Sequence, residues 1–230
     1  MIDIHSHVLP GIDDGSESPE MSRVLLSLLR QQGVETVVAT PHFYAMQDTP
    51  EDFLRRRKEA FDRMEYDPAE APHVLLGAEV AYFDGMCHAE ELDRLQLGNS
   101  GLLLVEMPFG AWTQRMIGEV CQLPLQTGLT PVLAHVNRYR RADQLPKYQK
   151  ELLEQGILFQ CNAEAFSILW ERRWALRMLR QGQIHFLGSD THNLTNRAPK
   201  LEQAAQVITR KLGAGILSTL TDFSKEMLKL

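Results

Sequence analysis

The chain begins MIDIHSHVLPGIDDGS over residues 1–16, and this stretch sets the pattern from which the fold is predicted. A short apolar strand, MIDIH, ends in His5, and His7 and a turn with two aspartates follow it. Side chains alternate along an extended chain with a period of two, so the H-x-H spacing places both imidazoles on the same side. Taken alone, the histidine pair fits either a structural role or a metal site, and the remaining sequence has to choose between them.

Short apolar stretches like MIDIH recur along the chain and alternate with amphipathic stretches. The predicted strands are residues 1–5, 34–40, 73–82, 102–107, 130–135, 157–163 and 184–190. The predicted helices are residues 19–33, 50–64, 113–128, 143–156, 166–182, 200–213 and 224–230. This alternation predicts an α/β fold, a distorted TIM-like (β/α)7 barrel in a single domain over residues 1–230. A doubly wound open sheet is the alternative, although no G-x-G-x-x-G or P-loop motif follows any strand.

The composition narrows the class of partner. With 24 basic and 30 acidic residues the net charge is −6, which argues against nucleic-acid binding by a basic surface. No apolar stretch is long enough to span a membrane, and the first residues lack the features of a signal peptide. We therefore expect a soluble, cytoplasmic protein without membrane insertion. The three cysteines form no C-x-x-C pair and are interpreted as ordinary core or surface thiols.

Most of the predicted strands end, at or just beyond the carboxyl end, in a side chain that can bind metal. In a parallel barrel these ends converge on one face, where active sites are built. Acids on otherwise apolar strands are costly to bury unless they are paired or coordinated. One aspartate of the Asp13–Asp14 turn is expected to stay in the turn and the other to reach this rim. The strand-end candidates are His5, His7, His42, Glu79, Glu106, His135, Asp190 and His192.

The candidate ligands are all nitrogen or oxygen donors, which favours Mn, Zn or Fe over metals that prefer thiolates. They are too many for one tetrahedral ion and enough for two or three, and sites with two metals suit the hydrolysis of phosphate esters. His73, His88 and His185 do not fit the pattern and are expected to be structural or solvated.

At these residues the sequence resembles the PHP (polymerase and histidinol phosphatase) superfamily. It is most similar to the manganese-dependent bacterial protein-tyrosine phosphatases that regulate capsule and exopolysaccharide synthesis. The resemblance lies in MIDIHSHVLPGIDDG, TVVATPH, LLGAEV, LLLVEMP, TPVLAHVNRY and LGSDTHNLTNR, which run in order from residue 1 to about residue 200.

The resemblance implies a centre of three divalent ions, Mn²⁺ first, with Fe or Zn as alternatives. The implied ligands are His5, His7, Glu79 and Asp190 for one ion, Glu79, Glu106 and His135 for the second, and Asp14, His42 and His192 for the third. It also implies phosphate-binding or transition-state roles for Arg138 and Arg197. If the leaving group needs a proton, His42 or His192 is the fallback donor. Relatives often have Glu before the first of these arginines, where this chain has Asn137.

The function implied is hydrolysis of phosphotyrosine by a metal-activated hydroxide. By the same resemblance, the partner would be the tyrosine-rich tail of a bacterial tyrosine kinase. Two alternatives stay open: a small-molecule phosphoesterase like histidinol-phosphate phosphatase, and a non-catalytic regulatory module stabilised by metal. An amidohydrolase is disfavoured because no lysine lies at a strand end to bridge its metals.

The stretch WERRWALRMLR, residues 170–180, places two tryptophans among arginines. It could cover an acidic or phosphorylated tail. The favoured interpretation is an amphipathic outer helix whose tryptophans enter the core.

Overall fold

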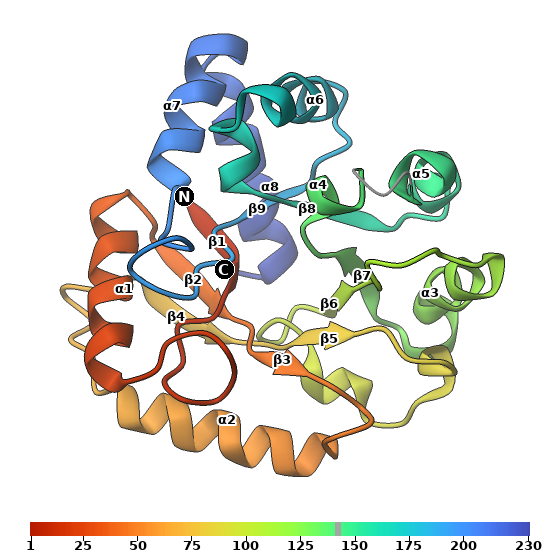
Figure 1. Ribbon diagram of the computed structural model, residues 1–230, viewed down its shortest axis with the longest axis horizontal. Helices are drawn as coiled ribbons and strands as arrows, with labels where there is room; N and C mark the ends of the chain where they lie inside the picture. Colours follow the sequence, from red (N-terminus) through yellow and green to blue (C-terminus); the bar gives the residue numbers. More distant parts are fainter. Residues whose placement is uncertain (141–143) are drawn as a thin grey trace.

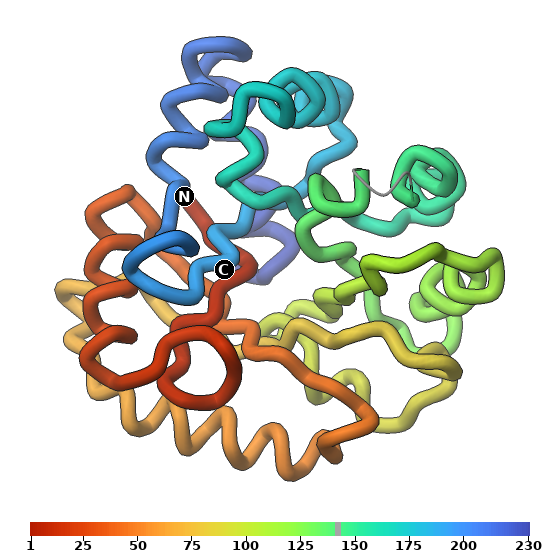
Figure 2. Tube along the Cα trace, viewed as in Figure 1, coloured from red at the N-terminus to blue at the C-terminus, as the bar shows by residue number. Residues whose placement is uncertain are grey.

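The computed structural model describes residues 1–140 and 144–230 (Figures 1 and 2). Its strands are β1 (Ile2–Ser6), β2 (Thr36–Ala39), β3 (His42–Phe43), β4 (His73–Leu76), β5 (Glu79–Ala81), β6 (Leu102–Glu106), β7 (Thr130–Leu133), β8 (Leu158–Asn162) and β9 (Phe186–Gly188). Its α-helices are α1 (Pro19–Gln31), α2 (Pro50–Met64), α3 (Gln114–Thr127), α4 (Val136–Tyr139), α5 (Gln144–Glu154), α6 (Leu169–Arg180), α7 (Leu201–Leu212) and α8 (Ala214–Leu228). Short 3-10 turns occupy Met86–His88, Leu92–Leu95 and Ala163–Phe166.

The strands form a curled parallel sheet with helices arranged around its outer side (Figure 1). Hydrogen-bonded neighbours run β1-β2-β4 and β3-β5-β6-β7-β8-β9, and these strands all pair in parallel. Beyond β9, a parallel bridge joins Ser6 to Thr191, and the amide of Asp190 donates to the carbonyl of His5 at 2.8 Å. The architecture is thus a mixed α/β fold with a curled parallel sheet.

One predicted strand is followed by a short strand that the sequence does not predict, and another is wrong in its continuity. The strand expected over 34–40 ends at Ala39 and resumes as β3, because Pro41 lies in between and has no amide proton to donate. The strand expected over 73–82 is divided into β4 and β5 at Gly77. A Cβ atom on that glycine would lie 2.7 Å from Cδ2 of Leu97, so the chain there passes too close to its neighbour for a larger residue.

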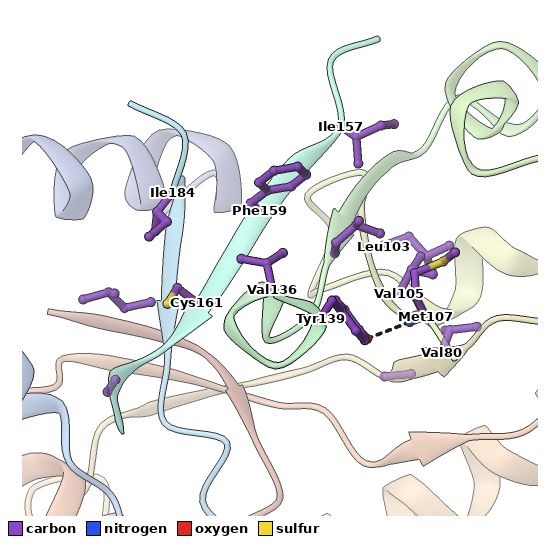
Figure 3. Packing of buried hydrophobic residues seen from close by; sticks show 14 of the residues in the cluster. Val80, Leu103, Val105, Met107, Val136, Tyr139, Ile157, Phe159, Cys161 and Ile184 are labelled. Carbon is purple, nitrogen blue, oxygen red and sulfur yellow. Dashed lines mark hydrogen bonds between the residues drawn. The ribbon is translucent and has the colours of Figure 1, made fainter. Parts of the chain in front are cut away.

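Side chains alternate between the inside of the curl and the layer beneath the helices. Along β6, Leu102 and Leu104 belong to an inner apolar cluster, whereas Leu103 and Val105 pack outward. Figure 3 shows the outward layer, in which the hydroxyl oxygen of Tyr139 accepts a hydrogen bond from the backbone amide of Met107 at 2.9 Å. The inner cluster consists of Ile2, Ile4, Val38, Leu97, Leu102, Leu104, Val132, Ala134, Phe186 and Leu228.

Helices α1, α2, α3, α5 and α7 begin within one residue of their predicted starts, whereas α6 begins three residues later than predicted. Ser18 caps α1 by accepting the amide of Met21 at 3.2 Å, and Pro19 occupies the first turn. The predicted helix over 143–156 is found as α5, and its expected first residue, Asp143, lies outside the described residues. The short helix α4 is absent from the prediction.

The last helix is much longer than predicted. It runs over α8 rather than over 224–230, and Leu228 enters the inner cluster, with Phe223 and Met227 packed against it. The helix therefore covers the amino ends of the strands. No helix in residues 1–140 and 144–230 combines the length and apolar character needed to cross a membrane.

Candidate metal centre

The structure brings all nine predicted ligands together at the carboxyl ends of the strands. Three groups have ligand atoms that all lie within 4.8 Å of one another. These groups are His5, His7 and Asp190; His7, Asp14, His42 and His192; and His42, Glu79 and Glu106.

The end of β1 owes its two inward histidines to an irregularity. In a regular strand Ile4 and His5 would point to opposite faces. Here Ile4 lies in the inner cluster and His5 also points inward, toward Glu79. The register between β1 and β2 shifts between Asp3 and Ser6, and such a bulge re-aims side chains. The Nε2 atoms of His5 and His7 consequently lie 3.2 Å apart.

Glu79 is the buried centre of the cluster. Its Oε2 lies 3.1 Å from His5 Nε2, 3.2 Å from His7 Nε2 and 3.1 Å from His42 Nδ1. Its Oε1 lies 3.0 Å from Nε2 of His135. Burial raises the pKa of Glu79, but the surrounding histidines outweigh it and hold the pKa well below its usual range.

Glu106 and His135 complete one side of this centre. Nε2 of His135 lies 3.2 Å from Oε1 of Glu106. His135 has a φ of 31°, a left-handed conformation that a non-glycine residue adopts at some cost. The conformation turns the chain directly from β7 into α4, so Arg138 follows three residues later on the same side of the molecule.

Asp190 forms ion pairs with both predicted phosphate-binding arginines. It forms an ion pair with Arg138, and its Oδ1 lies 2.7 Å from Nη2 of Arg197. The side-chain amide of Asn162 donates from Nδ2 to Oδ2 of Asp190 at 2.8 Å. Burial raises the pKa of Asp190, but His5 and Arg138 lower it well below its usual range. Asp190 also has a positive φ of 51°.

The third group opens toward solvent. Oδ1 of Asp14 lies 3.5 Å from Nε2 of His42 and 3.4 Å from Nε2 of His192. The side chain of Asp14 is 63% exposed, in contrast to the buried His192. Burial and the neighbouring His7 lower the pKa of His192 to about 3.

Asp13 does more than the turn role predicted for it. Its Oδ1 accepts the amide of Gly15 at 2.9 Å, as a turn residue would. Its Oδ2, however, lies 2.7 Å from Nδ1 of His7 and accepts the amide of His42 at 3.1 Å. Burial lowers the pKa of His7, but hydrogen bonds to Asp13 and Glu79 outweigh this and raise it to about 10. Asp13 therefore fixes which nitrogen of His7 faces the cluster.

Gln160 and Asn162 are site residues that the sequence reasoning missed. Oε1 of Gln160 lies 3.1 Å from Nδ1 of His5 and accepts the amide of His135 at 2.6 Å. Both residues lie on β8 and are buried. The available signal was two amides in the apolar stretch ILFQCNA, the same anomaly that identified the glutamates.

Asn137, the departure from the family pattern, takes a structural position. It is buried, and its Oδ1 accepts the amide of Asn162 at 3.0 Å. It therefore holds the end of β8 beside α4. The three histidines set aside in the sequence lie elsewhere: His73 and His88 are exposed, and His185 is partly buried at the amino end of β9.

The donor set fits divalent metal ions. Glu79 Oε2, His42 Nδ1 and His192 Nε2 are buried, and none of them has a hydrogen-bond partner within the described part of the chain. Each of these three atoms belongs to a residue whose ligand atom lies within 4.8 Å of the other ligand atoms of its group, a spacing at which one ion can contact them all. Nitrogen and carboxylate donors in this number suit Mn, Fe or Zn.

Comparison with known proteins decides the family. The family described as "Capsular polysaccharide synthesis, CpsB/CapC" matches residues 1–229. The chain belongs to this family. It is 32% identical to the tyrosine-protein phosphatase CpsB of Streptococcus pneumoniae over 226 residues, which cover 93% of this chain and 92% of that protein. It is 28% identical to the tyrosine-protein phosphatase YwqE of Bacillus subtilis, with coverage of 100% and 92%.

A solved structure supports the same relationship. A chain from the crystal structures of YwqE from Bacillus subtilis and CpsB from Streptococcus pneumoniae, described as metal-dependent tyrosine phosphatases, matches with a TM-score of 0.85. The match has 27% sequence identity and covers 100% of this chain and 94% of that chain. The family-level resemblance predicted from the sequence is thereby confirmed.

Proposed function

We propose that this protein is a metal-dependent protein-tyrosine phosphatase. The observation that carries the proposal is the cluster of nitrogen and oxygen donors around the buried Glu79, with Arg138 and Arg197 meeting at Asp190 on its more open side. The similarity to CpsB and YwqE supports the same activity.

The proposed centre holds three divalent ions, with Mn²⁺ the first candidate and Fe or Zn the alternatives. His5, His7, Glu79 and Asp190 would hold one ion, Glu79, Glu106 and His135 the second, and Asp14, His42 and His192 the third. Four carboxylates against three divalent ions leave the site near +2, so a phosphate dianion is attracted despite the chain's charge of −6. When bound, such ions neutralise the phosphate and lower the pKa of water, which supplies the nucleophile.

The chain's own residues bind the phosphate. Arg138 and Arg197 are partly exposed and offer planar guanidinium forks for phosphate oxygens. The tyrosine phenolate leaves with a pKa of about 10, so it needs less protonation than an alkoxide. His42 and His192 were predicted as fallback donors, but both are assigned above as metal ligands, so the proposed reaction releases the phenolate without a dedicated histidine acid.

Two exposed aromatic rings at the rim favour an aryl substrate over an alkyl one. The ring of Phe109, 55% exposed, stacks on His135 with centroids 5.8 Å apart. Tyr44 stacks on His42 at 5.4 Å. These rings flank the donor cluster and offer apolar surface to the phenyl ring of phosphotyrosine.

The proposal extends to the barrel, the substrate and the location of the protein. The bridge between Ser6 and Thr191 supports a distorted (β/α)7 barrel, and we propose that residues 1–230 form one domain. The proposed partner is a phosphotyrosine protein, with the tyrosine-rich tail of a bacterial tyrosine kinase as the expected substrate. The cytoplasmic location stays a prediction.

Elemental analysis combined with a phosphate-release panel tests the proposal. We expect more than one ion per chain and Mn-stimulated hydrolysis of phosphotyrosine peptides. Arg138→Ala should reduce kcat by about 100-fold or more, because a charged donor to the transferred phosphoryl group is lost. Arg30→Ala, which removes an exposed arginine from α1, serves as the matched control and should retain activity.

Two outcomes would replace the proposal. A clear preference for alkyl over aryl phosphates would favour a small-molecule phosphoesterase. A metal-loaded protein that is inert on the whole panel, together with a His5→Ala variant that unfolds, would favour a regulatory module.

A further inference from the structure

Helix α6 presents a row of arginines that the metal centre does not use. Arg173, Arg177 and Arg180 are exposed and follow the exposed Trp170 at spacings of three, four and three residues, so the four lie on one helix face. Together with Arg140 and the buried Trp174 they line a surface groove of 510 Å³. We call this surface the arginine groove.

Within the described parts of the chain, no acid pairs with the arginines that α6 contributes to the groove. Among residues 1–140 and 144–230, none of Arg173, Arg177 and Arg180 has a carboxylate within ion-pair distance, whereas Arg55 on α2 and Arg115 on α3 each pair with an acid on their own helix. Like charges one turn apart on a helix repel each other. In a chain with a net charge of −6, such a concentration of unpaired arginines favours an anionic occupant.

Aromatic surface accompanies the charge. Trp170 is 69% exposed, although the favoured sequence interpretation placed both tryptophans in the core. Of these two tryptophans only Trp174 is buried, and the guanidinium of Arg140 lies 5.8 Å from its ring centroid. Exposed tryptophan and arginine are the residue types that dominate protein-binding surfaces.

The groove begins beside the metal centre. Arg140 follows two residues after Arg138, which pairs with Asp190, and Nη1 of Arg140 donates to the carbonyl of Trp170 at 3.3 Å. Figure 1 shows α4, which contains Arg138, in the same part of the molecule as α6. Arg180 marks the far end. At 1.5 Å per helical residue the row from Trp170 is about 15 Å long, which an extended peptide of about five residues would cover.

We propose that the arginine groove binds an acidic polypeptide segment of the substrate that lies next to the phosphotyrosine. This inference rests on the proposed phosphatase function and adds a second contact to it. A polypeptide fits better than a membrane or a nucleic acid, because the row is one residue wide, ends at the catalytic face and belongs to an acidic protein. The segment's carboxylates would pair with the arginines while its phosphotyrosine reaches Arg138.

Kinetics on matched peptides test the groove. The substrates are a phosphotyrosine peptide with five flanking Glu or Asp residues, the same peptide with Gln and Asn, and p-nitrophenyl phosphate. We expect wild type to prefer the acidic peptide by about tenfold in kcat/KM, through KM, and to lose the preference in high salt. The triple variant Arg173→Gln/Arg177→Gln/Arg180→Gln should lose the preference and hydrolyse p-nitrophenyl phosphate like wild type.

A second triple variant controls for total charge. Arg55→Gln/Arg94→Gln/Arg210→Gln removes three exposed arginines from other elements and should retain the preference. Equal rates of wild type on both peptides, or a preference that survives in the groove variant, would overturn the groove while leaving the phosphatase intact. Failure on all three substrates would instead overturn the proposed function.

A direct binding measurement tests whether the arginine groove binds an acidic peptide, and it does not depend on catalysis. A fluorescent acidic peptide should bind wild type more tightly than the groove variant, as measured by anisotropy. Binding of anionic lipid vesicles or an RNA oligonucleotide that the groove variant loses, with no binding of the peptide, would assign the groove to another class of partner and overturn the inference.

Discussion

The carboxyl ends of the strands carry inward-pointing His, Asp and Glu, whereas the amino ends of the same strands carry inward-pointing Ile, Leu, Val and Phe. Strand β6 shows both halves within five residues: Leu102 and Leu104 enter the inner apolar cluster, and Glu106, on the same face, reaches His135. The two ends therefore share one backbone and one alternation. The two ends differ in what stabilises the inward side chains. Apolar side chains at the amino end need only close packing, whereas charged side chains at the carboxyl end need charged partners.

The energetic consequences of the two ends are opposite. Apolar burial at the amino end, covered by α8, stabilises the fold without any ligand. The carboxyl end includes left-handed conformations at His135 and Asp190 and buried carboxylates that need cations. The apolar amino end therefore supplies the folding stability that offsets the unfavourable conformations and buried charges at the carboxyl end. Substitutions at one end should affect stability, and substitutions at the other should affect metal binding and activity.

The largest expected effect is at the centre of the polar end. Glu79→Gln preserves the shape of the side chain and removes its charge, so metal occupancy should fall and phosphate release should drop by about a thousandfold. The free energy of unfolding, measured with the metal removed by a chelator, should change little. Elemental analysis, phosphate release and urea denaturation measure the three quantities. Full activity at full metal content would contradict the central role of Glu79.

The next effect belongs to the apolar end. Leu102→Ala removes a buried side chain from the inner cluster and should lower the free energy of unfolding by about 2–5 kcal/mol. The folded variant should keep the wild-type kcat. Leu125→Ala, at an exposed leucine of α3, is the control and should leave stability nearly unchanged. A loss of metal without a loss of stability would show that the two ends are not separable.

A smaller effect tests the residues behind the ligands. Asp13→Asn keeps the turn but weakens the acceptor that orients His7, so metal affinity should fall by about 10- to 100-fold. Titration with Mn²⁺ under competition from a chelator measures this change. Asp62→Asn, on the exposed face of α2, should bind metal like wild type. If both variants bind Mn²⁺ with wild-type affinity, Asp13 stabilises only the turn and does not support the metal ligand His7.

The smallest effect concerns a titratable group at the apolar end. Burial lowers the pKa of His185 from 6.5 to about 4, so the unfolded chain binds more protons between these values. This group's contribution to stability is therefore fully present above about pH 6.5 and is lost as the pH falls toward 4. At pH 5.5 the loss is about 1 kcal/mol.

His185→Asn provides the matched variant, because its amide oxygen can still accept the amide of Phe159, which lies 2.9 Å from Nδ1 of His185. Unfolding of chelated wild type and variant at pH 5.5 and 7.5 should show a smaller decrease for the variant. Identical decreases would mean that His185 does not titrate in this range.

Much of the fold was predictable because it depends on local pattern. The apolar stretches located every described strand except the two-residue β3, and Ser18 with Pro19 located the start of α1. The interruptions at Pro41 and Gly77 and the full length of α8 were missed. Those features depend on what packs nearby, such as Leu97 against Gly77 and the inner cluster against α8, which a pattern of single residues does not contain.

The candidate site was predictable for a related reason. A buried acid on an apolar strand is anomalous wherever it occurs, so Glu79 and Glu106 were visible without coordinates. The sequence by itself therefore determined the alternation of elements and the set of donors at the strand ends.

Only the tertiary structure decided which donors meet and what holds them. It placed Glu79 among four histidines, gave Asp13 to His7, and brought Gln160 to His5. The strand register and the bulge after Asp3 fix these contacts. The physical reason is that residue type sets what a side chain can bind, whereas the distances between side chains far apart in the sequence are set by how the strands pair and curl.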